Sequence, residues 1–269
     1  MFPRSSLKPV QAVAMLRAGL DVDGELLALA CASHSGEPAH RDAARRILAG
    51  AGLTEADLQN TPDLPLNAEA AHAWRLGGNG PTPLTQNCSG KHAAMLATCV
   101  AAGWDTATYR EPVHPLQKAV RATVAELTGA EPEHVAVDGC GAPLFSCTVA
   151  GLARAFALIA AAPPGTPEHR VATAVNAYPG FIGGTGRFVT DLIAAVPGLV
   201  AKDGAEGVFA AALPDGRAIA LKIADGGPRA VAPVAVAALR ALDVEIPDGI
   251  GRVPVLGHGE PVGEVRPAF

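Results

Sequence analysis

The sequence is poor in lysine, in aromatic residues and in blocks of like charge. Aromatic residues make up 4% of its 269 residues, and its net charge is −5. No cluster of Lys and Arg is present that could neutralise phosphates, so nucleic acid is not an expected partner. The longest apolar stretch, residues 149–162, is interrupted by Arg154 and falls short of the ~20 residues that a bilayer crossing requires, so no membrane partner is expected.

The chain also lacks a regular cysteine framework, and its first residues, Met1-Phe2-Pro3-Arg4-Ser5, predict no signal peptide. Its five cysteines are odd in number and irregularly spaced, which argues against structural disulfides and favours a reducing compartment. An apolar content of 49% excludes a disordered chain. We therefore expect a folded cytoplasmic protein, organised as a single domain over residues 1–269 with interleaved subdomains.

Lysine scarcity directs attention to a few positions. Sixteen of the 21 basic side chains are arginine, so a lysine that remains is expected where a compact amine able to lose its proton is required. The five lysines are Lys8, Lys91, Lys118, Lys202 and Lys222.

Hydrophobic periodicity predicts an α/β chain of the α+β kind. An antiparallel sheet flanked by helices would lie beside a mostly helical region. The sheet is indicated by two apolar runs on either side of Pro214-Asp215-Gly216, which is typical of a hairpin. Both hairpin strands are apolar on both faces, so we expect them to be covered on both sides. Helices are predicted at 9–17, 39–48, 67–76, 88–102, 115–127, 149–162 and 231–242, strands at 135–137, 207–213, 217–223 and 261–265, and either a strand or a helix at 26–31.

The first candidate for chemistry is Ser5-Ser6-Leu7-Lys8. A Ser and a Lys three residues apart lie on one face of a helix, where a neutral amine can take the hydroxyl proton. This spacing is also the nucleophile motif of penicillin-recognising serine enzymes. The plain alternative is a capping serine and a solvated lysine.

The second candidate is a metal site. Cys88 and His92 lie near each other in sequence, and Asp138 and Cys140 follow in a Gly-containing turn. Thiols, an imidazole and a carboxylate from separate loops are suitable ligands for a divalent metal. The alternative is that the two cysteines are buried thiols without a ligand role.

Two polar segments complete the candidates. Ser33-His34-Ser35 is typical of a hydrolase, although His34 cannot usefully reach its sequence neighbours, so its partners would have to come from elsewhere in the fold. The alternative is an ordinary polar turn. The Gly-rich segment 180–187 lacks the preceding strand and the acidic residue of a dinucleotide site, but its backbone N–H groups could bind an anion. Lys202 precedes the hairpin and is either functional or a surface lysine.

Taken in order, these segments resemble a known enzyme family. The motifs are Arg-Ser-Ser-Leu-Lys-Pro-Val-Gln at 4–11, Cys-Ala-Ser-His-Ser-Gly-Glu at 31–37, Asn-Cys-Ser-Gly-Lys-His at 87–92, Asp-Gly-Cys-Gly at 138–141, Gly-Gly-Thr-Gly-Arg at 183–187 and Leu-Val-Ala-Lys-Asp-Gly-Ala-Glu-Gly at 199–207. The chain resembles the Rhizobium etli type of L-asparaginase, the thermolabile class 3 enzymes, over essentially its whole length.

The resemblance implies a homodimer with a fold similar to serine β-lactamases and glutaminases, and hydrolysis of L-asparagine to L-aspartate and ammonia. It implies two serine–lysine tandems, Ser5 with Lys8 and Ser33 with Lys202. It also implies a zinc ion held with water, and substrate contacts near the tandems. The implied zinc ligands are Cys88, Lys91 and Cys140, with Lys91 in place of His92, and the implied substrate-binding residues are Arg4, His34, His92 and Asp138.

One feature departs from that family. Its members carry two strands before the Arg-Ser-x-x-Lys motif, whereas here Ser5 follows Met1 by four residues. The resemblance therefore implies that the N-terminal strands are missing. Two rival functions stay open at this point: a noncatalytic relative that still binds zinc, and a penicillin-recognising serine hydrolase.

Overall fold

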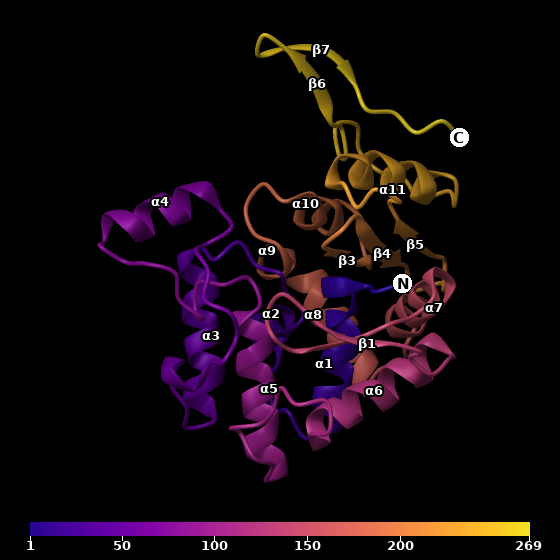
Figure 1. Cartoon of the computed structure of the whole chain (residues 1–269). Coiled ribbons are helices and arrows are strands. Elements are labelled where there is room, and N and C mark those ends of the chain that lie inside the picture. The colour runs from indigo at the N-terminus through magenta and orange to yellow at the C-terminus, as the bar shows by residue number, and fades with distance from the viewer.

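The computed structural model describes residues 1–269 and confirms the α+β fold class (Figure 1). The helices are α1 (Lys8–Arg17), α2 (Gly24–Ala30), α3 (Pro38–Gly50), α4 (Ala68–Leu76), α5 (Ser89–Ala102), α6 (Pro115–Thr128), α7 (Val149–Ala160), α8 (Pro167–Ala177), α9 (Pro179–Ile182), α10 (Phe188–Ala195) and α11 (Val231–Arg240), with 3-10 turns η1 (Arg4–Leu7), η2 (Glu55–Asp57) and η3 (Pro228–Ala230). The strands are β1 (Val135–Val137), β2 (Pro143–Phe145), β3 (Val200–Gly204), β4 (Val208–Ala212), β5 (Ala218–Lys222), β6 (Pro254–Gly257) and β7 (Glu260–Glu264).

Helix α1 is the centre of the helical region. It packs against α5, α6 and α8, and all its residues from Lys8 to Leu16 are buried. Most of its side chains are small or apolar, so neighbouring helices approach it on every side. A lysine on such a helix lies in the core instead of in water, which is unusual unless the charge has partners.

The main sheet has three antiparallel strands in the order β3-β4-β5. Helices α7 and α11 both contact β4 and β5, and every residue of β4 is buried, so this strand is covered on both faces as expected. The expectation is wrong for β5, whose residues are all half-buried. The reason is its place at the edge of the sheet, where one side has no neighbouring strand.

The predicted C-terminal strand is present as β7, but it does not join the main sheet. It pairs with β6 in a separate hairpin that projects from the body (Figure 1). Val255, Leu256 and Val262 of this hairpin are exposed. Such a two-stranded unit gains little stability from burial of its own side chains.

Other differences from the predicted elements are local. The segment 26–31 lies mostly in helix α2 and is not a strand, while β2, β3, β6 and α8 to α10 were not predicted. The longest helices, α5 and α6, have 14 residues each, and none has the length and apolarity of a membrane-spanning helix.

Candidate active site

The three lysines that belong to the motifs are all buried in the structure. Lys8, Lys91 and Lys202 are 1%, 2% and 0% exposed, whereas Lys118 is exposed and Lys222 is half-buried. Burying an ammonium is costly unless it has partners or loses its proton. Of the five lysines, the three in the motifs are therefore buried in the core and the other two are not.

Lys8 lies where α1, the end of α2 and the start of α5 meet. Its Nζ bonds to the carbonyl oxygen of Ala32, to Ser33 Oγ at 3.1 Å and to Cys88 Sγ at 3.1 Å. The Lys8 amine thus contacts both a serine of the predicted tandems and a cysteine of the predicted metal site. A neutral Lys8 at this distance could take the Ser33 hydroxyl proton.

The serines of the first motif have different environments. Ser6 is fully buried, and its Oγ donates to the carbonyl oxygen of Pro3 at 2.7 Å, which stabilises the turn η1. Ser5 is half-buried, and no hydrogen bond of Lys8 reaches it. The pairing of Ser5 with Lys8 stays a prediction, and in this structure the hydrogen-bonded partner of Lys8 is Ser33.

The Ser33 turn is held against the Gly-rich segment. The backbone N–H of Ser33 donates to the Ile182 carbonyl oxygen at 3.1 Å, and that of Ser35 to the Gly183 carbonyl oxygen at 2.7 Å. Gly184 has a φ of +123°, and a Cβ there would lie 2.6 Å from the Ser35 side chain. The glycine is required because both its backbone conformation and its close approach exclude a side chain.

His34 is turned into the protein. It is fully buried, its Nδ1 accepts from the Gly36 N–H at 3.1 Å, and its Nε2 lies 2.9 Å from Ser89 Oγ. With Nδ1 accepting, Nε2 carries the proton and donates to the serine. Burial lowers the pKa of His34 well below its ordinary value, so the ring is neutral. Both ring nitrogens have internal partners, and its predicted substrate contact stays a prediction.

Lys202 is held by the residue that follows it. Its Nζ donates to the Asp203 carbonyl oxygen at 2.7 Å and to Asp203 Oδ1, so the predicted pairing with Ser33 is not among its hydrogen bonds. Asp203 Oδ2 accepts from Arg187 Nη2 at 2.6 Å. Burial lowers the pKa of the Lys202 amine to about 8, which leaves part of the amine unprotonated near neutral pH.

Two cysteines meet on the other side of Lys8. Cys88, Cys140 and Ala142 form a small buried cluster, and Lys91 Nζ lies 3.1 Å from Cys140 Sγ. The neighbouring Cys88 and the Lys91 amine hold the pKa of Cys140 well below its ordinary value, while Cys140 and burial raise the pKa of Cys88. The two thiols therefore differ in how readily they lose their protons.

His92 differs from His34 in having an unused nitrogen. Its Nδ1 lies 2.6 Å from Tyr109 Oη, and its Nε2 is buried without a hydrogen-bond partner. Burial lowers the pKa of His92 to about 4, so the ring is neutral. If Tyr109 donates to Nδ1, the proton lies on Nε2, where it is available to a bound molecule.

Arg4 and Asp138 form an ion pair at the edge of the cluster. Arg4 Nε lies 2.7 Å from Asp138 Oδ1, and Arg4 Nη1 lies 3.1 Å from Glu206 Oε1. Arg4 has a φ of +52°, a conformation that non-glycine residues adopt at a cost. The turn that carries Ser5 is thus held in a strained geometry beside these carboxylates.

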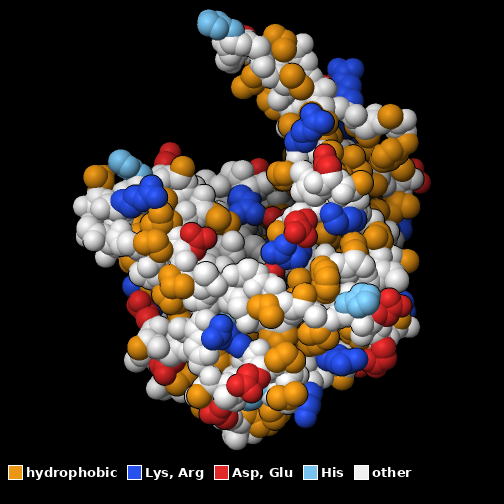
Figure 2. Space-filling model, in the orientation of Figure 1, with side chains coloured by type: hydrophobic (Ala, Val, Ile, Leu, Met, Phe, Trp, Pro, Cys, Tyr) orange, Lys and Arg blue, Asp and Glu red, His pale blue; other side chains and the backbone are white.

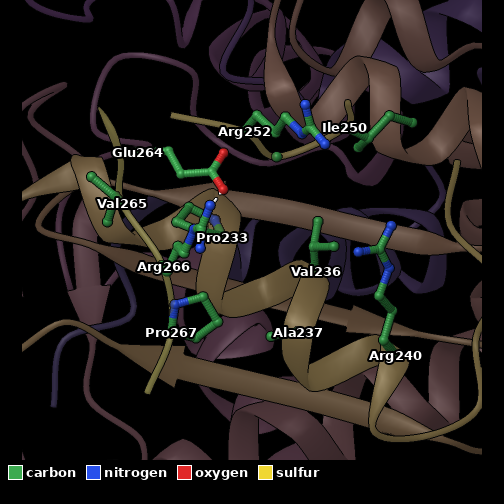
Figure 3. Close-up of a pocket in the computed structure, with 11 residues that line it drawn as sticks. Pro233, Val236, Ala237, Arg240, Ile250, Arg252, Glu264, Val265, Arg266 and Pro267 are labelled. Carbon is green, nitrogen blue, oxygen red and sulfur yellow. Dashed lines mark hydrogen bonds and ion pairs between the residues drawn. The ribbon is translucent and has the colours of Figure 1, made fainter. Parts of the chain in front are cut away.

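One face of the molecule is hollowed. The space-filling view shows a hollow between α4 and the part of the chain with α10 and α11, with acidic and basic side chains beside it (Figure 2). A separate pocket of about 370 Å³ lies between α11 and the C-terminal segment, where Arg240, Arg252 and Arg266 surround an apolar wall (Figure 3). That pocket shares no residue with the motifs, so it is not the candidate active site.

A comparison with known protein families shows which family the chain belongs to. A family model described as L-asparaginase II matches residues 1–267. The chain belongs to the L-asparaginase II family. No individual curated protein matches it. The matched residues include the three buried lysines, Lys8, Lys91 and Lys202, and the two cysteines Cys88 and Cys140.

In this member of the L-asparaginase II family, some residues around the site were not predicted. Asp203 and Tyr109 form hydrogen bonds with the predicted residues Lys202 and His92, and Arg187 bonds to Asp203. Two of them were within reach of sequence analysis, because Asp203 follows Lys202 and Arg187 ends the Gly-Gly-Thr-Gly-Arg segment. Tyr109 lies in an irregular segment, and only the packing of that segment on α5 reveals its contact with His92.

Proposed function

We propose that this chain hydrolyses L-asparagine to L-aspartate and ammonia. The single observation that supports the chemistry best is Lys8, a buried amine 3.1 Å from Ser33 Oγ in a chain of the L-asparaginase II family. A buried amine beside a hydroxyl is the arrangement that activates a serine without a histidine.

The reaction balances with a serine and a lysine alone. The serine Oγ attacks the carbon of the side-chain amide and gives its proton to a neutral lysine amine. The tetrahedral intermediate then breaks its C–N bond, and the lysine returns the proton to the departing ammonia. Water hydrolyses the resulting ester and frees aspartate and the serine. We assign Ser5 and Ser33 as the candidate nucleophiles and Lys8 and Lys202 as the bases.

The substrate contacts follow from charge. Arg4 offers a guanidinium for the carboxylate of asparagine, and Asp138 offers a carboxylate for its ammonium group. His92 Nε2 is free to bind a polar group of the substrate. From the resemblance we also propose a homodimer located in the cytoplasm; the five cysteines, all unpaired, support a reducing compartment.

The residues implied for zinc fit a metal in their chemistry. No group of three or more His, Cys, Asp or Glu side chains converges in the structure, so a site here needs Lys91 as a ligand. Cys88 and Cys140 would bind as thiolates and Lys91 as a neutral amine, which leaves a fourth position for water. When bound, the ion would supply positive charge beside Lys8.

Zinc content should depend on Cys88 and not on Cys99. We expect about one zinc per chain, lost in Cys88→Ser because a hydroxyl is a poor zinc ligand. Cys99 is also fully buried on α5 but lies outside the thiol cluster, so Cys99→Ser is the matched control and should keep the metal. Elemental analysis of the purified proteins measures this, and equal zinc in both variants would reject the site.

The function is tested with two substrates. Wild-type protein is incubated with L-asparagine, and ammonia and aspartate are measured together; the proposal expects them in equal amounts. A labelled penicillin is the second arm, because the spacing of Ser5 and Lys8 is shared with penicillin-recognising enzymes. Stable labelling by the penicillin without asparagine turnover would replace the proposed function with the rival one.

A further inference from the structure

Lys202 has a single acidic partner. Its side chain is 0% exposed, and its hydrogen bonds go only to the carbonyl and the Oδ1 of Asp203. A lysine that has no exit to water takes its protonation state from the charges around it. The state of Asp203 therefore decides how firmly Lys202 holds its proton.

Asp203 is shared with a second cation. Its other carboxylate oxygen, Oδ2, accepts from Arg187 Nη2 at 2.6 Å. Burial works to raise the pKa of the Asp203 carboxyl, but Lys202 and Arg187 together hold it well below its ordinary value. One carboxylate charge is thus divided between an arginine, which never loses its proton, and a lysine, which can.

The position of Arg187 is fixed by the Ser33 turn. Arg187 ends the Gly-rich segment, whose Thr185 N–H donates to Glu37 Oε1 at 2.8 Å and whose Gly183 carbonyl oxygen accepts from Ser35 at 2.7 Å. The loop carrying the arginine and the loop carrying Ser33 are therefore tied together. A displacement of one loop would move the guanidinium relative to Asp203.

Apart from Asp203, the titratable groups that face Lys202 are cationic or neutral. Lys8 from α1 and Arg187 from the Gly-rich segment are the cations, Asp203 is the carboxylate, and the Cys31 thiol at the end of α2 is the remaining titratable group. Burial raises the pKa of Cys31 to about 12, so it stays a neutral thiol. The Asp203 carboxylate thus faces two cations, Lys202 and Arg187.

We propose that Arg187 is a positioning residue for the proposed hydrolysis: by holding one oxygen of Asp203, it weakens the hold of that carboxylate on the Lys202 proton and keeps Lys202 able to act as a base. This inference rests on the proposed function for its catalytic meaning. The charge relation itself is a property of the folded chain and can be measured without substrate. The lowered pKa of Lys202 agrees with it.

The first measurement follows the lysine directly. With only five lysines, the NMR spectrum of protein labelled at the lysine ε-carbon has few signals, and Lys202→Met assigns the one of interest. In Arg187→Gln the titration midpoint of Lys202 should rise by about one pH unit, because a nearby cation is lost. In Asp203→Asn it should fall, because the counter-charge is lost.

The Lys202 midpoint is expected to move in opposite directions in these two variants, which a merely structural role of Arg187 would not produce. Arg187→Lys keeps the charge and should keep a midpoint close to that of wild type, and Arg217→Gln, in a surface ion pair with Asp215, should not move it. A midpoint that is unchanged in Arg187→Gln, or that moves the same way in Arg187→Gln and Asp203→Asn, would overturn the inference. Thermal melts show that each variant is folded.

The second measurement connects the lysine to the reaction. If Lys202 must be neutral, the acidic limb of the kcat/KM profile for L-asparagine should move with the NMR midpoint, to higher pH in Arg187→Gln and to lower pH in Asp203→Asn. A limb that stays in place while the midpoint moves would overturn the assignment of Lys202 as a base. A folded wild-type protein without turnover would contradict the proposed function, while the NMR midpoints would still decide the inference about Arg187.

Discussion

Lys8→Met should abolish asparagine hydrolysis while the protein stays folded. Lys8 Nζ bonds to the carbonyl oxygen of Ala32, Ser33 Oγ and Cys88 Sγ, and all three contacts are lost together. Removal of a catalytic base commonly lowers the rate by about 10²- to 10⁴-fold, and loss of a residue that acts as part of a unit lowers it further. We therefore expect kcat/KM to fall by roughly three orders of magnitude or more.

Stability should change far less than activity in this variant. Methionine fills a similar volume, and replacing a buried charge with an apolar side chain is often close to neutral. The carbonyl oxygen of Ala32 loses its partner, at a cost of about 1–3 kcal/mol. Lys118 is exposed on α6, so Lys118→Met makes the same chemical change outside the site and should leave both kcat/KM and the melting temperature unchanged. A Lys8→Met enzyme within a few-fold of wild type would remove Lys8 from the mechanism.

Gly204→Ala should destabilise the protein and reduce its activity. A Cβ at position 204 would lie 2.6 Å from the Pro3 carbonyl oxygen and 3.1 Å from the Ser6 backbone nitrogen. These are backbone atoms of the turn that carries Ser5, so the strand or the turn must move. Overpacking of this kind costs about 1–3 kcal/mol, or roughly 2–4 °C in melting temperature for each kcal/mol. Lys202 lies two residues away on β3 and would move with the strand.

The control for this substitution is Gly50→Ala. A Cβ at position 50, the last residue of α3, has no atom within 4 Å, and alanine is the better helix former. Its melting temperature should be unchanged or higher, and its activity unchanged. Thermal melts and steady-state rates of the two variants give the comparison, and a Gly204→Ala protein that matches wild type in both would show that β3 and the Ser5 turn are not packed as described.

The features that depend on local sequence patterns were predicted from the sequence. The hairpin of β4 and β5 follows from Pro214-Asp215-Gly216, and Gly216 adopts a φ of +90° in its turn. The helices around α1 follow from apolar periodicity and their end signals. The scarcity of lysine predicted special positions, and three of the five lysines are buried together with motif residues.

What the sequence did not predict depends on contacts between distant segments. Strand β3 contains Lys202, Asp203 and Gly204, a poor strand sequence that is stabilised by pairing with β4 and by the ion pair with Arg187. Lys8 on α1 contacts Ser33 just after α2, and the spacing of residues along the sequence does not predict such a contact. Ligand chemistry alone named His92 with Cys140 and did not name Lys91, whose amine lies 3.1 Å from the Cys140 sulfur.

The most direct test of the account is ammonia release from L-asparagine by the double variant Ser5→Ala/Ser33→Ala, compared with wild type at equal concentrations of folded protein. Either serine alone could attack the amide, so only the double variant removes both candidate nucleophiles. The account predicts steady release by the wild type and, in the double variant, no release above that of asparagine in buffer. Release by the double variant at the wild-type rate, or a folded wild type that releases none, would contradict a serine–lysine amidohydrolase.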